Sequence, residues 1–253
     1  MKKILSIAAM TALMTTAANA DFLRIEGAVG AWQSGPSGSI SYANNSFDLA
    51  DAAGFNDSTN MYAWIYLKHP IPIIPNLRLE YADPSFDGTV ASITWDGNNY
   101  ANVNNTLSLR QYDAALYYNI LDNTFWMTID LGLDVKFIEG NYKIDADAVN
   151  SSASVDQDLH LVMPLAYARG RVQIPVTDIG IEVLARGMSY GGSEIIDAEI
   201  KIDYTMGFIP VIQPGLELGY RYQKVKIDSS DIGVNANLDT TFSGVYGGIM
   251  LRF

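Results

Sequence analysis

The sequence predicts an all-β protein, an antiparallel transmembrane β-barrel of about 10 strands. Ten segments alternate between an uncharged face and a face that carries the charged residues, which is the pattern of a strand with two different surroundings. After residue 20, no apolar run is long enough to form a membrane-spanning helix. The 253 residues include no cysteine, so stability must come from a packed core or from closure of a sheet.

Residues 1–20 are predicted to be a secretory signal peptide. Lys2 and Lys3 form a positive start, a short apolar run follows, and a small-x-small cleavage site ends at Ala20. The run is too short to span a bilayer, which needs roughly 20 residues. We therefore expect export, cleavage after Ala20, and one domain over residues 21–253.

The first half of the exported chain supplies five predicted strands. Prolines and clusters of glycine, asparagine and aspartate separate them, because these residues favour turns over a strand ladder. The expected strands are residues 21–33, 60–68, 77–81, 107–119 and 124–137. The polar residues 34–58 and the acidic residues 139–157 are predicted to be loops, and residues 89–95 a strand piece that projects beyond the membrane.

The second half supplies five more strands, at residues 159–174, 179–190, 195–206, 216–226 and 240–253. An even number of strands would place both ends of the chain on the periplasmic side. The last strand, TTFSGVYGGIMLRF, resembles the C-terminal strand that the insertion machinery of bacterial outer membranes reads, so Phe253 is the candidate insertion signal. The rival fold is a soluble β-sandwich whose uncharged faces pair as two sheets.

Two short segments carry a family resemblance. Residues 112–123, YDAALYYNILDN, and residues 219–222, GYRY, look like segments of a poorly characterised family of small proteobacterial outer-membrane β-barrels. These barrels are distantly like the outer-membrane protein W and protein A families. The resemblance implies the fold and a location in the cell outer membrane, and it implies no activity.

Charged residues in the middle of the strands fall on the faces expected to line the barrel interior. The two signs nearly balance, and the interior of a barrel this small can be filled by side chains. Because an unpaired buried charge is costly, we expect these residues to pair, whereas an open ion pathway is the alternative. The candidate lumen charges are Arg24, Glu26, Arg78, Glu80, Asp113, Asp130, Asp134, Lys136, Arg169, Arg171, Glu182, Arg186, Glu199, Lys201, Glu217 and Arg221, with Lys68, Asp203 and Arg252 on the same faces.

Three functions are compatible with such a barrel. We predict a passive channel for small solutes; the alternative is a closed-lumen barrel with a structural or surface-interaction role. A barrel hydrolase that uses His160 is third, because Asp158 lies two residues before it as in the omptin proteases. The acidic pair Asp145 and Asp147 lies beside that dyad instead of across the barrel, and pairing His160 with a loop serine (residues 151–152) has almost no support. We predict no enzyme activity and no catalytic, cofactor-binding or metal-binding residues.

The formal net charge of −12 argues against a nucleic-acid partner. We expect the protein to be a monomer that contacts outer-membrane lipid, lipopolysaccharide and the barrel-insertion machinery. Acidic residues of the loops could bind divalent cations that bridge lipopolysaccharide phosphates, although their spacing matches no calcium loop. These acidic residues are Asp48, Asp51, Asp57, Asp83, Asp87, Asp145, Asp147, Asp156, Asp158 and Asp231.

Aromatic residues at strand ends are candidates for the two interfacial belts. We assign Tyr118, Trp126, Tyr204, Tyr220 and Phe253 to the periplasmic belt, and Trp32, Tyr62 and Tyr190 to the outer one.

Overall fold

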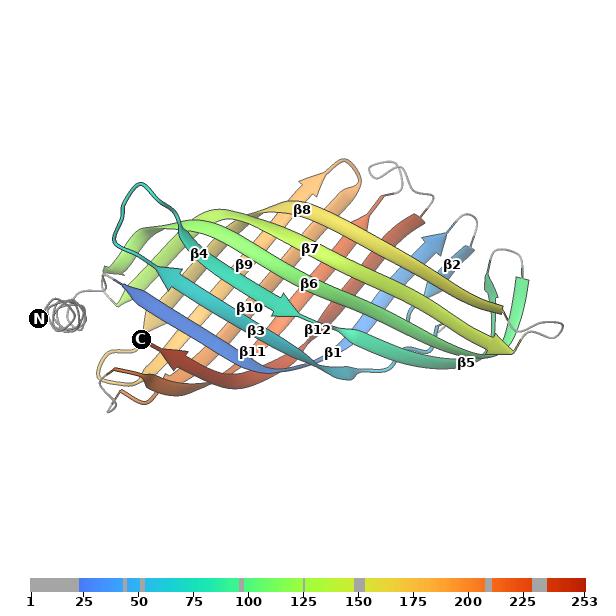
Figure 1. Ribbon diagram of the computed structural model, residues 1–253, viewed down its shortest axis with the longest axis horizontal. Helices are drawn as coiled ribbons and strands as arrows, with labels where there is room; N and C mark the ends of the chain where they lie inside the picture. Colours follow the sequence, from blue (N-terminus) through green and yellow to red (C-terminus); the bar gives the residue numbers. More distant parts are fainter. Residues whose placement is uncertain are drawn as a thin grey trace, which may run out of the picture.

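The computed structural model describes residues 23–42, 45–50, 53–95, 98–124, 126–147, 153–207, 211–228 and 236–253. The predicted signal peptide, residues 1–20, lies outside this part of the chain. Within the described residues, ten strands form the wall of a barrel (Figure 1): β1 (Arg24–Tyr42), β3 (Ser58–Lys68), β4 (Asn76–Ala82), β6 (Asn98–Thr124), β7 (Met127–Asp147), β8 (Ala153–Gln173), β9 (Ile179–Tyr190), β10 (Ser193–Thr205), β11 (Gln213–Ile227) and β12 (Ala236–Arg252).

The barrel is closed by its first and last strands. Every neighbouring pair is antiparallel, and β12 pairs with both β11 and β1, in a register that sets Gly30 opposite Gly248. Two shorter strands add to the wall: β2 (Asn45–Asp48) pairs with β1, and β5 (Ser85–Trp95) pairs with β6. The predicted barrel of about ten strands is therefore confirmed, and the rival sandwich is wrong.

Four strands are much longer than predicted. β6 begins at Asn98 and ends at Thr124. β1 continues to Tyr42, β7 continues to Asp147, and β8 begins at Ala153, so most of the loops predicted over residues 34–58 and 139–157 are strand. Residues still alternate there, but the apolar side chains now face inward and the charged ones outward. Ile144 is fully buried, and its neighbours Lys143 and Asp145 face outward. Above the bilayer, the outer face of a strand meets water and carries polar residues. The uncharged outer face by which we recognised strands is therefore missing there.

An uncharged band surrounds the outside of the barrel. On β7 it runs from Met127 to Phe137, and Leu133 within it is 70% exposed. Eleven residues tilted at about 45° rise about 25 Å, which is the height of the lipid-facing band of outer-membrane barrels. No helix in the described part of the chain is long and apolar enough to cross a membrane. The band therefore identifies these strands as the membrane-spanning elements.

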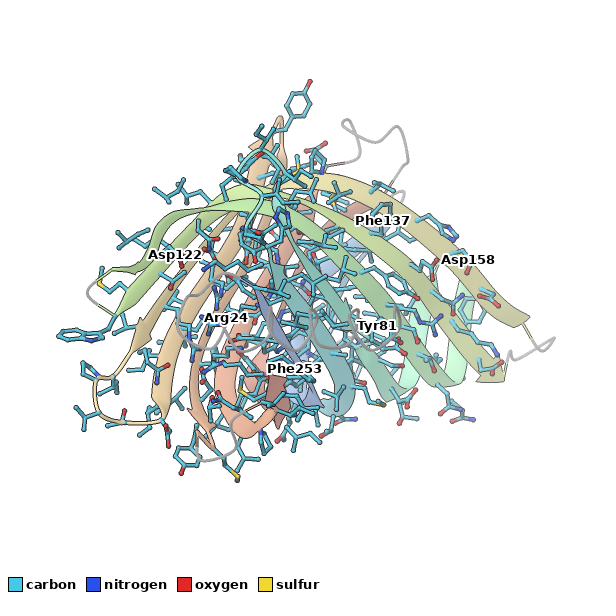
Figure 2. The ribbon with its side chains drawn as sticks, turned by 60° about the vertical axis from the view of Figure 1, so that its left-hand side comes forward. Arg24, Tyr81, Asp122, Phe137, Asp158 and Phe253 are labelled. Carbon is cyan, nitrogen blue, oxygen red and sulfur yellow. The ribbon has the colours of Figure 1, made fainter. Side chains whose placement is uncertain are left out.

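The aromatic belts differ in part from the predicted ones. The five residues assigned to the periplasmic belt all face outward and are exposed, although Tyr220 lies higher, opposite Val245. Trp32 and Tyr62 were assigned wrongly to the outer belt: they are 1% and 5% exposed inside the barrel. Both share a face with inward charged residues of their strands, which the alternation already indicated. Tyr81 and Phe137 mark the outer edge of the band (Figure 2), and Tyr112 lies opposite each of them on the neighbouring strand.

Above the band, the outer face of the wall turns polar. Arg110 lies 3.6 Å from Asp83 and 4.0 Å from Glu139, and the Asp83 carboxylate raises the pKa of the Arg110 guanidinium. Strands β5 to β8 continue beyond this level and form an extension at the end opposite the chain termini (Figure 1). Asp158 lies in this extension, whereas Arg24, Asp122 and Phe253 lie toward the other end (Figure 2).

The extension encloses an apolar core. Phe86 stacks on Phe242 with ring centroids 5.4 Å apart, and both side chains are fully buried. Leu49, Ala53 and Phe55 are also buried in this core, where Phe55 makes an edge contact with Tyr142 at 6.3 Å. Burial raises the pKa of the Tyr142 phenol to about 12. The barrel interior thus has two zones, a charged one inside the membrane band and an apolar one outside it.

Candidate functional site in the barrel lumen

The structure places all the predicted lumen charges inside the barrel. All are buried except Arg24 and Glu199, whose side chains are 15% and 9% exposed. They come from strands β1, β4 and β6 to β11, and with Asp197, Asp203 and Arg252 they form three linked clusters, which we call the periplasmic, middle and outer clusters. The alternation of each strand is what turns every second side chain inward.

The periplasmic cluster joins the two ends of the chain. It consists of Arg24, Glu26, Arg171, Asp203 and Arg252. Glu26 accepts hydrogen bonds from Arg24, at 2.5 Å, and from Arg252 of the last strand. Arg171 donates two hydrogen bonds to Asp203, which also lies 3.6 Å from Arg252. Because β1 and β12 both contribute, this cluster reinforces the seam that closes the barrel.

The middle cluster consists of Arg78, Asp130, Arg169, Glu182, Lys201 and Glu217. Arg169 donates to Asp130 at 2.7 Å and to Glu182 at 2.5 Å. Lys201 donates to Glu217 at 2.9 Å, and its ammonium lies 4.0 Å from the centre of the Trp64 ring. Aromatic residues therefore fill the space between the ion pairs, and cation–π contacts supplement the hydrogen bonds.

The outer cluster consists of Glu80, Asp113, Asp134, Lys136, Arg186, Asp197, Glu199 and Arg221. Asp197 is its centre: it accepts from Arg221 at 2.6 Å and from Lys136 at 3.0 Å, and Arg186 lies 3.5 Å away. Arg186 also donates to Glu80 across the barrel. These contacts tie β4, β7, β9, β10 and β11 together through one group of side chains.

Sequence reasoning missed three central members of this site. Asp197 lies on the same face of β10 as Glu199 and Lys201, so continuing the alternation by one step would have found it. Gln111 and Gln223 are uncharged and were not considered, yet both are fully buried and donate to each other at 2.8 and 2.7 Å. Gln223 also donates to Asp197 at 3.2 Å, which places the glutamine pair on top of the outer cluster.

Asp134 differs from the other carboxylates. Both its oxygens are buried, and neither has a hydrogen-bond partner in the described part of the chain. Its ion pair with Arg186 is long, at 3.6 Å. The outer cluster holds five carboxylates and three cations, so Asp134 is the carboxylate that the network satisfies least.

A cross-section at the level of the outer cluster and just above it is filled by side chains. A side chain with no exposed surface borders no void large enough to hold a water molecule. Nine different strands each contribute a side chain that is at most 1% exposed: Trp32, Phe86, Gln111, Lys136, Leu165, Leu184, Asp197, Gln223 and Phe242. A cavity between Gln111, Leu161 and Phe242 has a volume of only about 10 Å³, about the size of one water molecule. The described side chains leave no path for a solute here.

A pocket lies at the periplasmic rim of the barrel. It has a volume of about 310 Å³ and lies between the β3–β4 turn and β6, and Lys68, His69, Tyr118 and Asp122 are among its lining residues. Lys68 donates to both oxygens of Asp122 at 2.7 Å. The pocket therefore ends in ion-paired side chains at the base of the charged zone.

The residues of the hydrolase hypothesis lie outside the lumen. His160 is exposed on the outer face of β8, opposite Glu139. Asp158 accepts from Asn141 at 2.9 Å, and Asp145 lies 3.7 Å from Lys143. Residues 151–152 fall outside the described part of the chain. The structure thus brings no nucleophile or cavity to His160 among the described residues, and the hydrolase hypothesis gains no support.

The acidic residues considered for divalent cations are scattered. Asp48, Asp57, Asp87, Asp156 and Asp158 are exposed, and Asp87 accepts from Thr106 at 3.0 Å. Asp51 and Asp231 lie outside the described residues, and nothing is described of the Asp147 side chain. Within the described residues, no group of three or more acidic or histidine side chains is arranged to hold a metal ion.

Comparisons with known proteins find only distant structural similarity. The chain matches no known sequence family, and no curated protein matches it. It is similar to solved structures of outer-membrane barrels, among them the translocator domain of the autotransporter NalP from Neisseria meningitidis, at 14% identity and a TM-score of 0.42, covering 100% of this chain and 98% of that one. A FadL homologue from Pseudomonas aeruginosa matches at 10% identity and 0.39, covering 95% and 92%. Ail from Yersinia pestis matches at 7% and 0.35, covering 92% and 99%. Similarity this low carries no information on function.

The architecture itself fixes the class of protein. A closed antiparallel barrel with an even number of strands and an uncharged outer band is the form that bacterial outer-membrane proteins take. The predicted resemblance to small outer-membrane barrels and the predicted location in the outer membrane are therefore confirmed. Membership of a particular family is not established.

Proposed function

We propose that this outer-membrane barrel has a closed lumen and works through its surface outside the membrane. The observation that carries the proposal is the filled cross-section at the outer cluster, to which nine strands contribute side chains that are at most 1% exposed. The extension of β5 to β8 supports the second half of the proposal, because buried apolar side chains such as Phe86, Val103 and Ile144 lie on its inner face, while its outer face above the bilayer is polar.

The energetics of the outer cluster argue for closure. A path past Asp197 would separate this carboxylate from Lys136 or Arg221 inside the protein. Removing one partner from a buried ion pair costs about 3–5 kcal/mol. A penalty of that size leaves an open state at no more than about 1% of the population. Closure is therefore the resting condition that this arrangement of charges favours.

The first prediction concerns conductance. The refolded protein, residues 21–253, is expected to give no steady single-channel current in a planar bilayer, because the lumen is filled. Heat-modifiable migration on a gel confirms in the same sample that the barrel has folded. A steady current that changes when Arg169 is replaced by glutamine would contradict the proposal, because Arg169 lies in the middle cluster and would then line a conducting path.

Passive transport of a small polar solute is the second candidate function. It is supported by the charged interior, which extends through the membrane band, and by the pocket of about 310 Å³ at the periplasmic mouth. Transport would require the Gln111–Gln223 pair and the apolar side chains above it to move aside. The same recording decides between the two candidates, since transport predicts current and closure predicts silence.

We also propose that Phe253 acts as the signal for the barrel-insertion machinery. Its ring is 53% exposed at the periplasmic end, while its backbone N–H donates to Ile25 O at 2.8 Å. Replacing Phe253 with alanine should slow assembly in cells several-fold and leave the unfolding midpoint of the purified barrel nearly unchanged. Equal losses in both measurements would mean that Phe253 serves only packing. Contact with lipopolysaccharide and a monomeric state remain predictions.

A further inference from the structure

One strand of the extension has a free side. β8 pairs with β7 along its whole length, from Ala153 to Val172, without a register shift. Its pairing with β9 ends at Ala166, opposite Gly187. Residues 153–165 of β8 therefore have no strand paired with them on the β9 side among the described residues, and β8 continues past the end of β9 at Tyr190 and the β9–β10 hairpin (Figure 1).

The reason that the β8–β9 pairing ends at this point lies in the sequence. Continuing the register would place Ser189 opposite Pro164, and proline has no N–H to donate to a ladder. The direction of the remaining backbone groups follows from two hydrogen bonds at the other end of β8. Gln173 donates to Trp126 of the β7 side, and Ile174 donates to Ile179 of the β9 side, each at 2.9 Å. Even-numbered residues of β8 thus face the free side, so Asp156, Asp158 and His160 present their N–H groups there.

The two faces of this edge have opposite character. Leu161 and Met163 point inward and pack partly buried against the apolar cluster around Leu165. Asp156 and Asp158 point outward and are exposed, and both accept hydrogen bonds from Asn141, at 2.6 and 2.9 Å. A strand added here would meet apolar side chains on one face and carboxylates on the other.

We propose that the free edge of β8 binds an extended peptide segment of a basic partner by strand addition, with basic residues alternating with apolar ones. This inference rests on the proposed surface function and names its partner class. An exposed strand edge supplies unpaired N–H and C=O groups, and alternate side chains supply specificity. A second copy of the chain is a poor occupant, because antiparallel self-pairing would set the carboxylates of Asp156 and Asp158 against each other.

The test uses the refolded barrel in nanodiscs and a synthetic peptide of alternating lysine and valine, long enough to match the free edge. We expect it to bind at least about tenfold more tightly than a peptide of the same composition with its lysines and valines in two blocks. Hydrogen exchange at the amides of Asp158 and His160 should slow on binding. Equal binding of the two peptides, or unchanged exchange at these amides, would overturn the proposal.

Two matched pairs of variants separate strand addition from simple charge attraction. His160→Pro removes an edge N–H without touching the β7 ladder and should weaken binding about tenfold, whereas His160→Ala keeps the N–H and should bind like the wild type. Asp158→Lys should weaken binding, whereas Asp178→Lys, in the exposed β8–β9 turn on the periplasmic side, should not. If His160→Pro binds as well as His160→Ala, strand addition is wrong.

The peptide-binding test of the β8 edge and the conductance test of the closed lumen can fail independently of each other. A silent bilayer together with no peptide binding would leave the lumen closed and remove this partner class. A conducting barrel that still binds the alternating peptide with slowed exchange would retain the edge site and remove closure.

Discussion

Replacing Asp197 with asparagine is expected to destabilise the folded barrel by about 3–5 kcal/mol. This carboxylate is fully buried and holds Arg221 at 2.6 Å and Lys136 at 3.0 Å, with Gln223 at 3.2 Å. An asparagine of the same shape has no charge, so it would leave two buried cations in contact with a neutral amide. The loss should appear as a lower urea midpoint for unfolding of the barrel in detergent or lipid, followed by the change in gel migration.

Asp134→Asn is the matched control, because it removes one carboxylate from the same cluster by the same chemical change. Neither oxygen of Asp134 has a hydrogen-bond partner among the described residues, and its ion pair with Arg186 is 3.6 Å long. Removing a poorly satisfied buried charge from a cluster with an excess of carboxylates should be neutral or stabilising. If both variants lose the same stability, the network does not distinguish the two carboxylates and the outer cluster is not centred on Asp197.

Much of the membrane-spanning barrel could be predicted because one rule governs it. In the lipid band every second residue must be uncharged, so strands such as residues 124–137 are visible from their pattern alone. The same rule assigns inward and outward faces, and it predicted that Arg186 and Lys201 face inward, as they do. Where the prediction departed from the rule, as for Trp32, it failed: the residue type suggested an interfacial belt and the alternation indicated the interior.

The extension could not be predicted in the same way. Outside the bilayer the outer face meets water, so the residues around Ile144 read as a polar loop although every second side chain is buried. The wall there also depends on contacts that are distant in sequence, such as Asn105 donating to Ala53 O at 2.9 Å. Nothing local to either segment encodes that contact.

The candidate site was predictable in membership and unpredictable in geometry. Alternation lists which charges face inward, and near-balance of sign indicates that they pair. It cannot say that Arg186 reaches Glu80, because the two residues lie on strands β9 and β4 and meet only across the barrel. Closure likewise depends on uncharged groups, the Gln111–Gln223 pair and the apolar side chains above it, which a search for charged residues passes over.

Replacing Gly30 with valine is expected to abolish the folded barrel, because the closing seam has no room for a side chain. A Cβ atom on Gly30 would overlap the backbone oxygen of Gly247 and lie 2.7 Å from the ring of Tyr62. The backbone oxygen cannot move aside without parting β1 from β12. The Tyr62 ring is held as well, because its hydroxyl donates to Glu217 at 2.6 Å and its ring makes an edge contact with Tyr246 at 5.2 Å.

Gly170→Val is the matched control for this variant. Gly170 lies on the lipid side of β8, and a Cβ atom on it would have no neighbouring atom within 4 Å, so valine fits there and suits a strand. The measurement is the fraction of unheated protein that migrates as the folded form after refolding into lipid vesicles, together with the conductance of any inserted fraction. Loss of the folded band for Gly30→Val alone would show that the barrel folds only when β1 and β12 can pair closely. An equal folded fraction for the two variants would mean that β1 and β12 can separate locally while the charged clusters hold the rest of the barrel together.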